Sequence, residues 1–189
     1  RPAAEPILFG SLQDLPRTGR RSGGWPRGRK GRPVRKSVIG PEPGAKVDLE
    51  SFLDLERVAR VEITSEEPDR PIEAALVPGA GNGWQAAAPG PQKVRIVFDE
   101  SQKVRRVRLV VEEPRVERTQ QLTLSWIPAG EAGKRELVRQ QFTFSPGGAT
   151  REVEDYAFGL DGVAAIELEI VPDIGGGETR ASLASLRVG

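Results

Sequence analysis

Three polar segments of this chain, at 65–70, 112–118 and 173–178, mix carboxylates with arginine. Carboxylate and guanidinium groups together can form bidentate hydrogen bonds with vicinal hydroxyls, with a phosphate or with a uronate. The alternative interpretation is that these charges only solubilise the tips of loops. From these segments and from a turn between them, we select as candidate ligand-binding residues Glu66, Asp69, Arg70, Gln85 and Arg118.

A second set of candidates comes from a repeated hexapeptide. Gln120-Gln-Leu-Thr-Leu-Ser125 recurs as Gln140-Gln-Phe-Thr-Phe-Ser145, which predicts two strands that form a hairpin through 128–134. If residues near 127 and 135 pair at the turn, Gln121 lies opposite Gln141 and Thr123 lies opposite Arg139. This amide and hydroxyl ladder could hydrogen-bond sugar hydroxyls through Gln121, Arg139 and Gln141, or it could stabilise the hairpin without any ligand.

Trp84 has two interpretations. Its ring could stack on the apolar face of a sugar, which makes it a candidate ligand-binding residue, or it could pack at the edge of the core. Trp126 alternates in phase with Leu122 and Leu124, so we expect it in the core.

The composition excludes most catalytic chemistry. The chain has no His and no Cys, which rules out Ser-His-Asp and Cys-His arrangements and zinc sites built from imidazole or thiolate. The neighbouring Glu112 and Glu113 point to opposite faces of a strand, which does not suit a glycosidase pair. Asn82-Gly83 is interpreted as a tight turn between strands rather than as part of a phosphate loop. We therefore predict a protein that is not an enzyme and has no cofactor.

Basic residues are concentrated at the start of the chain. Residues 1–46 hold 11 Lys and Arg against 3 Asp and Glu, whereas the remainder holds 17 against 24. The Gly, Pro and Arg content predicts a tail that is disordered when free. Two of its segments, 26–30 and 30–33, resemble degenerate AT-hook cores. The tail could bind a nucleic acid or another polyanion, wrap a partner protein, or act as a solvated linker. Its candidate contact residues are Arg27, Arg29, Arg32, Arg35 and Lys36.

From Val47 onward, short stretches alternate apolar and polar residues between Gly and Pro, which predicts antiparallel strands. About eight strands fit a jelly-roll β-sandwich over 47–189. Only Asp48 to Leu55 favours a helical turn. Further strands are predicted at 58–64, 137–144, 152–158 and 181–188. The inward-facing apolar sets are Val94, Ile96 and Phe98; Val107, Leu109 and Val111; Leu122, Leu124 and Trp126; and Ile166, Leu168 and Ile170.

No run approaches the ~18 consecutive apolar residues of a membrane span, and the start of the chain lacks the apolar region of a signal peptide. We therefore predict a cytoplasmic location. The chain has 189 residues, of which 37% are hydrophobic and 29% charged, which suits one ordinary domain with an extension.

An ordered series of motifs resembles the opening strands of galactose-binding-like, or discoidin-like, domains. The series consists of Thr64-Ser65-Glu66, the segment 71–75, Gly83-Trp84 and the segment 89–92. The segments 118–126, 139–156 and 181–189 are similar to small bacterial proteins described as carbohydrate-binding. The resemblance covers roughly Val47 to Gly189 and implies a sandwich that binds carbohydrate.

Many discoidin-like domains hold a structural calcium ion with the help of a Glu in the last strand. Here Ser185 stands roughly in that place, which removes an anionic ligand, and we predict no metal. The resulting prediction is a non-catalytic module that binds a carbohydrate or another polar ligand. The alternatives are a protein-interaction or scaffold subunit whose basic tail wraps a partner, and nucleic-acid binding through the tail.

Overall fold

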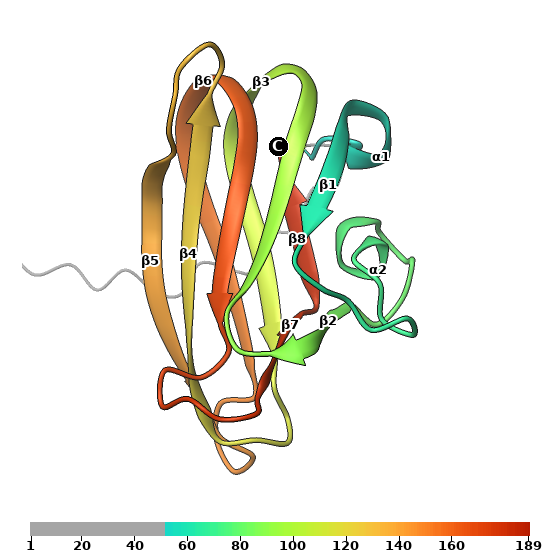
Figure 1. Cartoon of the computed structure of the whole chain (residues 1–189), viewed down its shortest axis with the longest axis vertical. Helices are drawn as coiled ribbons and strands as arrows, with labels where there is room; N and C mark the ends of the chain where they lie inside the picture. The colour runs from blue at the N-terminus through green and yellow to red at the C-terminus, as the bar shows by residue number, and fades with distance from the viewer. Residues whose placement is uncertain (1–51) are drawn as a thin grey trace, which may run out of the picture. The chain divides into compact units, whose positions relative to one another are not determined.

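The computed structural model describes residues 52–189. The basic tail and its candidates Arg27, Arg29, Arg32, Arg35 and Lys36 lie outside these residues, so the tail and its boundary stay predictions. Two short helices and eight strands follow one another along the described chain (Figure 1). They are α1 (Leu55–Val58), β1 (Ala59–Ile63), α2 (Glu73–Leu76), β2 (Trp84–Pro89), β3 (Gln92–Glu112), β4 (Arg118–Pro128), β5 (Arg135–Phe144), β6 (Arg151–Val171), β7 (Arg180–Leu183) and β8 (Ser185–Val188).

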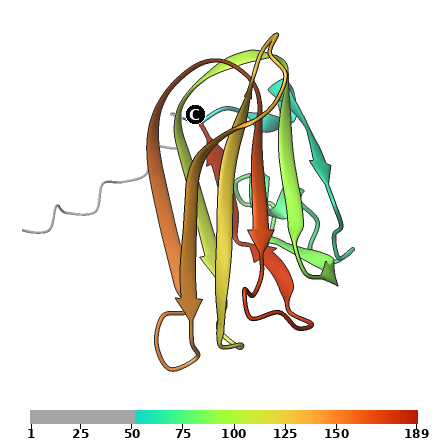
Figure 2. The same ribbon diagram turned by 60° about the vertical axis from the view of Figure 1, so that its left-hand side comes forward.

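The chain forms an all-β sandwich with antiparallel pairing, as predicted. The larger sheet has the order β1-β3-β6-β4-β5, and β8 also pairs with β3. The first half of β3 pairs with β1, and its second half pairs with β8. β6 runs beside β3 through both halves. Figure 2 shows β3 and β6 curving over the end of the molecule that carries the C-terminus. Each of these strands therefore contributes one half to each of the two layers of the sandwich.

The two long strands correct the prediction, which treated each of them as two separate strands. The predicted sets Val94–Phe98 and Val107–Val111 both belong to β3, and 152–158 and 166–170 both belong to β6. Register shifts between Val97 and Arg106 interrupt the β3–β6 ladder. Such irregularities let a paired strand bend without ending, so the polar residues at the bend do not mark a loop.

The core lies between the two layers and contains the predicted apolar sets. All of them are buried except Trp126, which is half-buried against the core. The Arg135 guanidinium lies over the Trp126 ring, 5.4 Å from its centre. Period-two alternation thus located the core correctly, because side chains on a strand point alternately to its two faces.

The helices differ from the prediction. α1 begins at Leu55 and follows Asp54, whereas the start of the predicted helical turn, Asp48, lies outside the described residues. α2 was not predicted at all, although Glu-Ala-Ala-Leu consists of good helix formers. A helix of four residues is too short to show a helical period in the sequence. Within residues 52–189 no helix is long and apolar enough to cross a membrane, and the cytoplasmic location stays a prediction.

β2 and β7 form a separate two-stranded sheet in which Gln85 lies opposite Ser182. In Figure 1 this sheet lies at the end of the sandwich opposite the curve of β3 and β6. The connections between β1 and α2, between β3 and β4, and between β6 and β7 also reach this end, which makes it the place to look for a site.

Candidate functional site

The three polar segments selected from the sequence meet at this end of the sandwich. The segment after β1 is fixed to β2, because the Glu67 N–H donates to the Gln85 carbonyl (2.8 Å) and the Gln85 N–H donates to the Arg70 carbonyl (3.1 Å). The segment before β7 is fixed to β4, because the Ile174 N–H donates to the Thr119 carbonyl (2.8 Å). Sequence alone could not show that these loops share one end.

Together they line a cleft of about 670 Å³, a size typical of small-molecule sites. Its lining includes three arginines and three glutamates, namely Arg70, Arg115, Arg180, Glu112, Glu113 and Glu178. Val116 adds an apolar surface, with 45% of the residue exposed. No aromatic residue is among the lining residues. The cleft therefore offers hydrogen-bond donors and acceptors of both charges but no stacking platform.

Arg118 lies behind the wall of the cleft. Its side chain is fully buried and contacts Glu113 at 3.1 Å. It also donates to the Arg180 carbonyl at 2.8 Å. Burial lowers the pKa of Arg118, and the negative charge of Glu113 opposes this effect. Arg118 thus fixes Glu113 and β7 in place, instead of reaching a ligand itself as the sequence suggested.

Arg70 and Gln85 do line the cleft, and they contact each other. The Arg70 guanidinium donates to the Gln85 side-chain oxygen at 3.1 Å and to the Asn82 carbonyl at 3.0 Å. These contacts hold the guanidinium in one orientation, so less side-chain entropy is lost when a ligand binds.

Three other candidates lie elsewhere. Glu66 lines a separate groove beside β1, where its carboxylate accepts from the Ile72 N–H at 2.9 Å. Asp69 is exposed and does not line the cleft. Trp84 is fully buried, and its indole N–H donates to the Ser65 carbonyl at 3.2 Å. The core interpretation of Trp84 is therefore confirmed, and its ring offers no face to a sugar.

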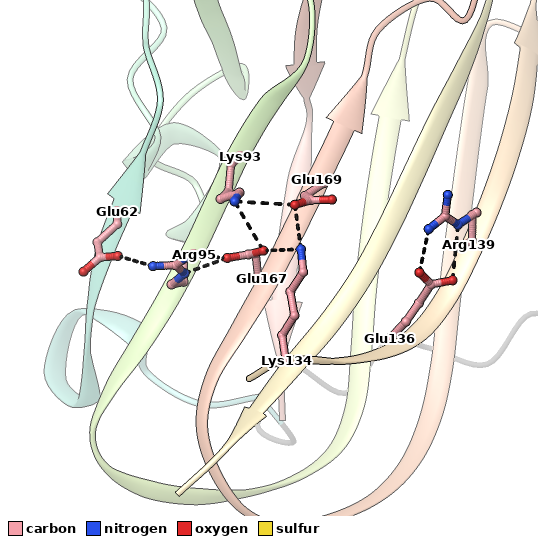
Figure 3. A network of polar contacts seen from close by, with 8 residues as sticks. All are labelled: Glu62, Lys93, Arg95, Lys134, Glu136, Arg139, Glu167 and Glu169. Carbon is pink, nitrogen blue, oxygen red and sulfur yellow. Dashed lines mark hydrogen bonds and ion pairs between the residues drawn. The ribbon is translucent and has the colours of Figure 1, made fainter. Parts of the chain in front are cut away.

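Both predicted cross-strand pairs of the hairpin are confirmed, although a register shift between Leu124 and Ser125 moves the pairing at the turn to Trp126 and Arg135. Gln121 lies opposite Gln141 and Thr123 opposite Arg139, and the two glutamines are joined by a hydrogen bond of 3.0 Å. Arg139 forms an ion pair with Glu136 at 2.7 Å (Figure 3). None of these residues lines the cleft. The structure therefore separates the candidates into a cleft at the loop end and a ladder on the β4–β5 hairpin.

A network of charges covers the outer face of β1, β3 and β6 (Figure 3). At its centre is Glu167, of which 1% is exposed. Glu167 accepts from Arg95 at 2.7 Å and from Lys134 at 2.8 Å. Burial alone would raise the pKa of Glu167, but the hydrogen bonds from Lys134 and Arg95 outweigh burial and lower the pKa to about 2. This network is a structural feature of the sheet and lies apart from the cleft.

Sequence reasoning missed the individual cleft residues Arg115, Arg180 and Glu113. Two of them, Arg115 and Glu113, belong to the segment 112–118. The sequence therefore indicated the correct loop but not the residues in it that line the cleft. Arg180 begins β7, just beyond the segment 173–178. Within residues 52–189 no group of three or more His, Cys, Asp or Glu could hold a metal ion, and the expectation that the protein binds none stays a prediction.

Comparisons with known proteins support the architecture. No family model and no curated protein matches the sequence. Among solved structures, module CBM32-3 of a family 31 glycoside hydrolase from Clostridium perfringens matches with 17% identity and a TM-score of 0.53, over 74% of this chain and 94% of that one. A pectin-binding carbohydrate-binding module matches with 14% identity and a TM-score of 0.52, over 70% and 91%. The fold is galactose-binding-like.

A third structure agrees. The family 32 module from NanJ of Clostridium perfringens, solved with galactose, matches with 19% identity and a TM-score of 0.50, over 69% of this chain and 92% of that one. The predicted resemblance to galactose-binding-like domains is thus confirmed for the fold. Because identities this low establish only the fold, the function has to be argued from the site itself.

Proposed function

We propose that this chain is a non-catalytic module that binds a carbohydrate, or another ligand rich in hydroxyl groups, in the cleft at the loop end. The observation that carries the proposal is the set of three arginines and three glutamates around one cleft. The walls are held by buried Arg118 and by the ladder between β2 and β7. The carbohydrate-binding modules that share the fold add support.

The chemistry of the cleft suits vicinal hydroxyl groups. A carboxylate accepts two hydrogen bonds from neighbouring hydroxyls, and a guanidinium donates two from its planar edge. Arg115 has no side-chain partner among residues 52–189 and lies free at the mouth of the cleft. Val116 beside it can contact the carbon-bonded face of a sugar ring. Without an aromatic platform, specificity rests on these polar groups.

The adjacent Glu112 and Glu113 do not suit hydrolysis. A glycosidase needs two carboxyl groups on opposite sides of the scissile bond, one of which must carry a proton. Glu113 is already bound to Arg118 and accepts from the N–H groups of Arg115 and Val116. It therefore acts as a fixed acceptor. Glu112 is paired with Arg151 at 3.0 Å, away from Glu113.

A glycan array probed with the full chain, followed by calorimetry on the best glycan, tests the proposal. Arg115→Ala should raise the Kd about tenfold, because a hydrogen bond to a charged group contributes roughly 1.5–3 kcal/mol. Arg180→Ala should act in the same direction. Arg139→Ala and Gln141→Ala, on the hairpin ladder, are the matched controls and should leave the Kd unchanged.

Three results would contradict the proposal. If no glycan binds the folded chain, the cleft is not a carbohydrate site. If the ladder variants lose binding and the cleft variants keep it, the site is the β4–β5 hairpin instead. Binding that disappears in moderate salt for every anionic glycan would indicate the basic tail, since contacts with polyanions weaken steeply with salt.

A further inference from the structure

β1 is an edge strand. In the sheet order β1-β3-β6-β4-β5 it pairs with β3 on one side, and within residues 52–189 no strand pairs with its other side. Figures 1 and 2 both show β1 at the margin of the sheet with β3 on its inner side. Proteins protect such edges with short strands, charged side chains, proline, bulges or covering segments. β1 has five residues, two of them charged. β1 contains no proline, and its register with β3 is unbroken from Ala59 to Ile63.

The direction of each backbone group in β1 follows from the ladder. The Thr64 N–H donates to the carbonyl of Lys93. Because residues of an antiparallel strand point their N–H and C=O groups alternately toward and away from the partner strand, Arg60 and Glu62 also face β3. The backbone groups of Ala59, Val61 and Ile63 therefore face outward. They present three acceptors and two free donors, because the Ala59 N–H donates to the Leu55 carbonyl at the end of α1.

The side chains of these same three residues line a groove that also contains Glu56, Glu66 and Glu73. The groove has a volume of about 500 Å³ and continues onto Ile72 and Leu76 beside α2. Val61 and Ile63 are only half-buried, although β-branched residues that point inward in a sheet are usually buried. A strand added beside β1 would satisfy the outward backbone groups and place alternate side chains over this groove.

We propose that the strand that pairs with this edge is β1 of a second copy of the chain, arranged antiparallel about a twofold axis at Val61. In that register Val61 lies opposite Val61 of the second copy, and Ala59 lies opposite Ile63. The Val61 and Ile63 N–H groups of each copy then meet the Val61 and Ala59 carbonyls of the other copy, whereas the Ala59 N–H keeps its bond to Leu55. Arg60 of each copy lies opposite Glu62 of the other on the exposed face of the sheet.

The charges select this register. Sliding the two strands by two residues keeps the outward backbone groups facing each other but places Arg60 opposite Arg60, or Glu62 opposite Glu62. Like charges directly opposite each other destabilise a sheet. Both side chains are exposed, by 65% for Arg60 and 46% for Glu62. Within one copy they pair with each other at 3.7 Å, and Glu62 also pairs with Arg95 at 3.0 Å, so the contact across the dimer would be shared with these bonds. Only the register centred on Val61 pairs all five residues and places opposite charges together.

An interface of one five-residue strand is small, so the dimer should be weak and dependent on concentration. Sedimentation velocity on the full chain, from about 5 to about 500 µM, should show a monomer–dimer equilibrium. Arg60→Glu places carboxylates opposite Glu62 twice in the symmetric dimer and should raise the Kd about tenfold. Val61→Pro removes the central outward N–H and should abolish the dimer. It leaves the β3 ladder intact, because that N–H does not face β3.

A mixing experiment distinguishes this pairing from a general loss of stability. Glu62→Lys should also weaken the dimer, and the variant should stay folded because Arg95 keeps its bond to Glu167. An equimolar mixture of Arg60→Glu and Glu62→Lys restores opposite charges at both positions, so a heterodimer should form at concentrations where each variant alone is largely monomeric. A monomer at every concentration would overturn the proposal. A dimer unaffected by all of these substitutions, or a mixture that stays monomeric, would do the same.

Discussion

Replacement of Gly83 by alanine should destabilise the protein by about 3 kcal/mol or more. Gly83 has a φ of +83°, where a residue with a side chain is disfavoured by roughly 1–2 kcal/mol. A Cβ there would also lie 2.5 Å from the Leu183 carbonyl oxygen and 2.7 Å from the Ala184 Cα. Both are backbone atoms of the β7–β8 connection, which cannot move aside as a flexible side chain can, and such overpacking typically costs roughly 1–3 kcal/mol.

Gly130→Ala is the matched control. Gly130 has a φ of +73°, and a Cβ there meets nothing within 4 Å, so the substitution introduces the backbone strain without the clash. Urea denaturation followed by circular dichroism should give a loss of roughly 1–2 kcal/mol for Gly130→Ala. Equal losses for the two variants would show that the close approach of β7–β8 to Gly83 does not matter.

The Gly83 substitution should also affect the proposed cleft. Arg70 donates to the Asn82 carbonyl at 3.0 Å, and Trp84 anchors the next position in the core. A shift of the backbone at Gly83 would therefore move a guanidinium that lines the cleft. We expect Gly83→Ala to weaken ligand binding as well as to lower the free energy of unfolding.

The conformation of Gly83 illustrates what sequence can and cannot predict. Asn82-Gly83 was interpreted as a tight turn between strands, but the element before it is α2. A side chain at position 83 is excluded by the backbone of Leu183 and Ala184, which are about a hundred residues away along the chain. Local patterns carry no information about such an approach. By contrast, the β4–β5 register is a local property of a short hairpin, and the repeated hexapeptide predicted two of its cross-strand pairs correctly.

The candidate site shows the same difference between local patterns, which the sequence predicts, and contacts between distant segments, which it does not. Period-two alternation identified the core sets, because the rule operates within a single strand. Continued back along β4, it also places Arg118 on the inward face with Leu122 and Leu124, and Arg118 is indeed buried. The sequence interpretation assigned Arg118 to a loop because an arginine in the core is rare. Its partner Glu113 lies in the same segment 112–118, but the Arg180 carbonyl comes from β7, so the sequence could not show that Arg118 is buried with both partners.

Glu167→Gln should lower the free energy of unfolding by about 3 kcal/mol at neutral pH. The pKa of Glu167 falls from 4.5 to about 2 in the folded protein, and each unit corresponds to roughly 1.4 kcal/mol. Substitution also leaves Lys93, Arg95 and Lys134 close together around a neutral amide. Lys93 and Lys134 keep Glu169, and Arg95 keeps Glu62, so the loss comes from removing the one buried carboxylate and should be measurable by urea denaturation.

The pH dependence identifies the cause. A carboxylate whose pKa is lowered by folding contributes its stability above the unfolded pKa, here 4.5, and loses it as the pH falls toward about 2. The parent protein should therefore lose stability over this interval, whereas the part of the loss that comes from Glu167 should be missing in Glu167→Gln. Glu136→Gln, which breaks the exposed pair with Arg139 on the neighbouring hairpin, should change stability little, since exposed ion pairs contribute weakly. If the two variants behave alike between about pH 4.5 and 2, the network around Glu167 does not stabilise the sheet through its buried charge.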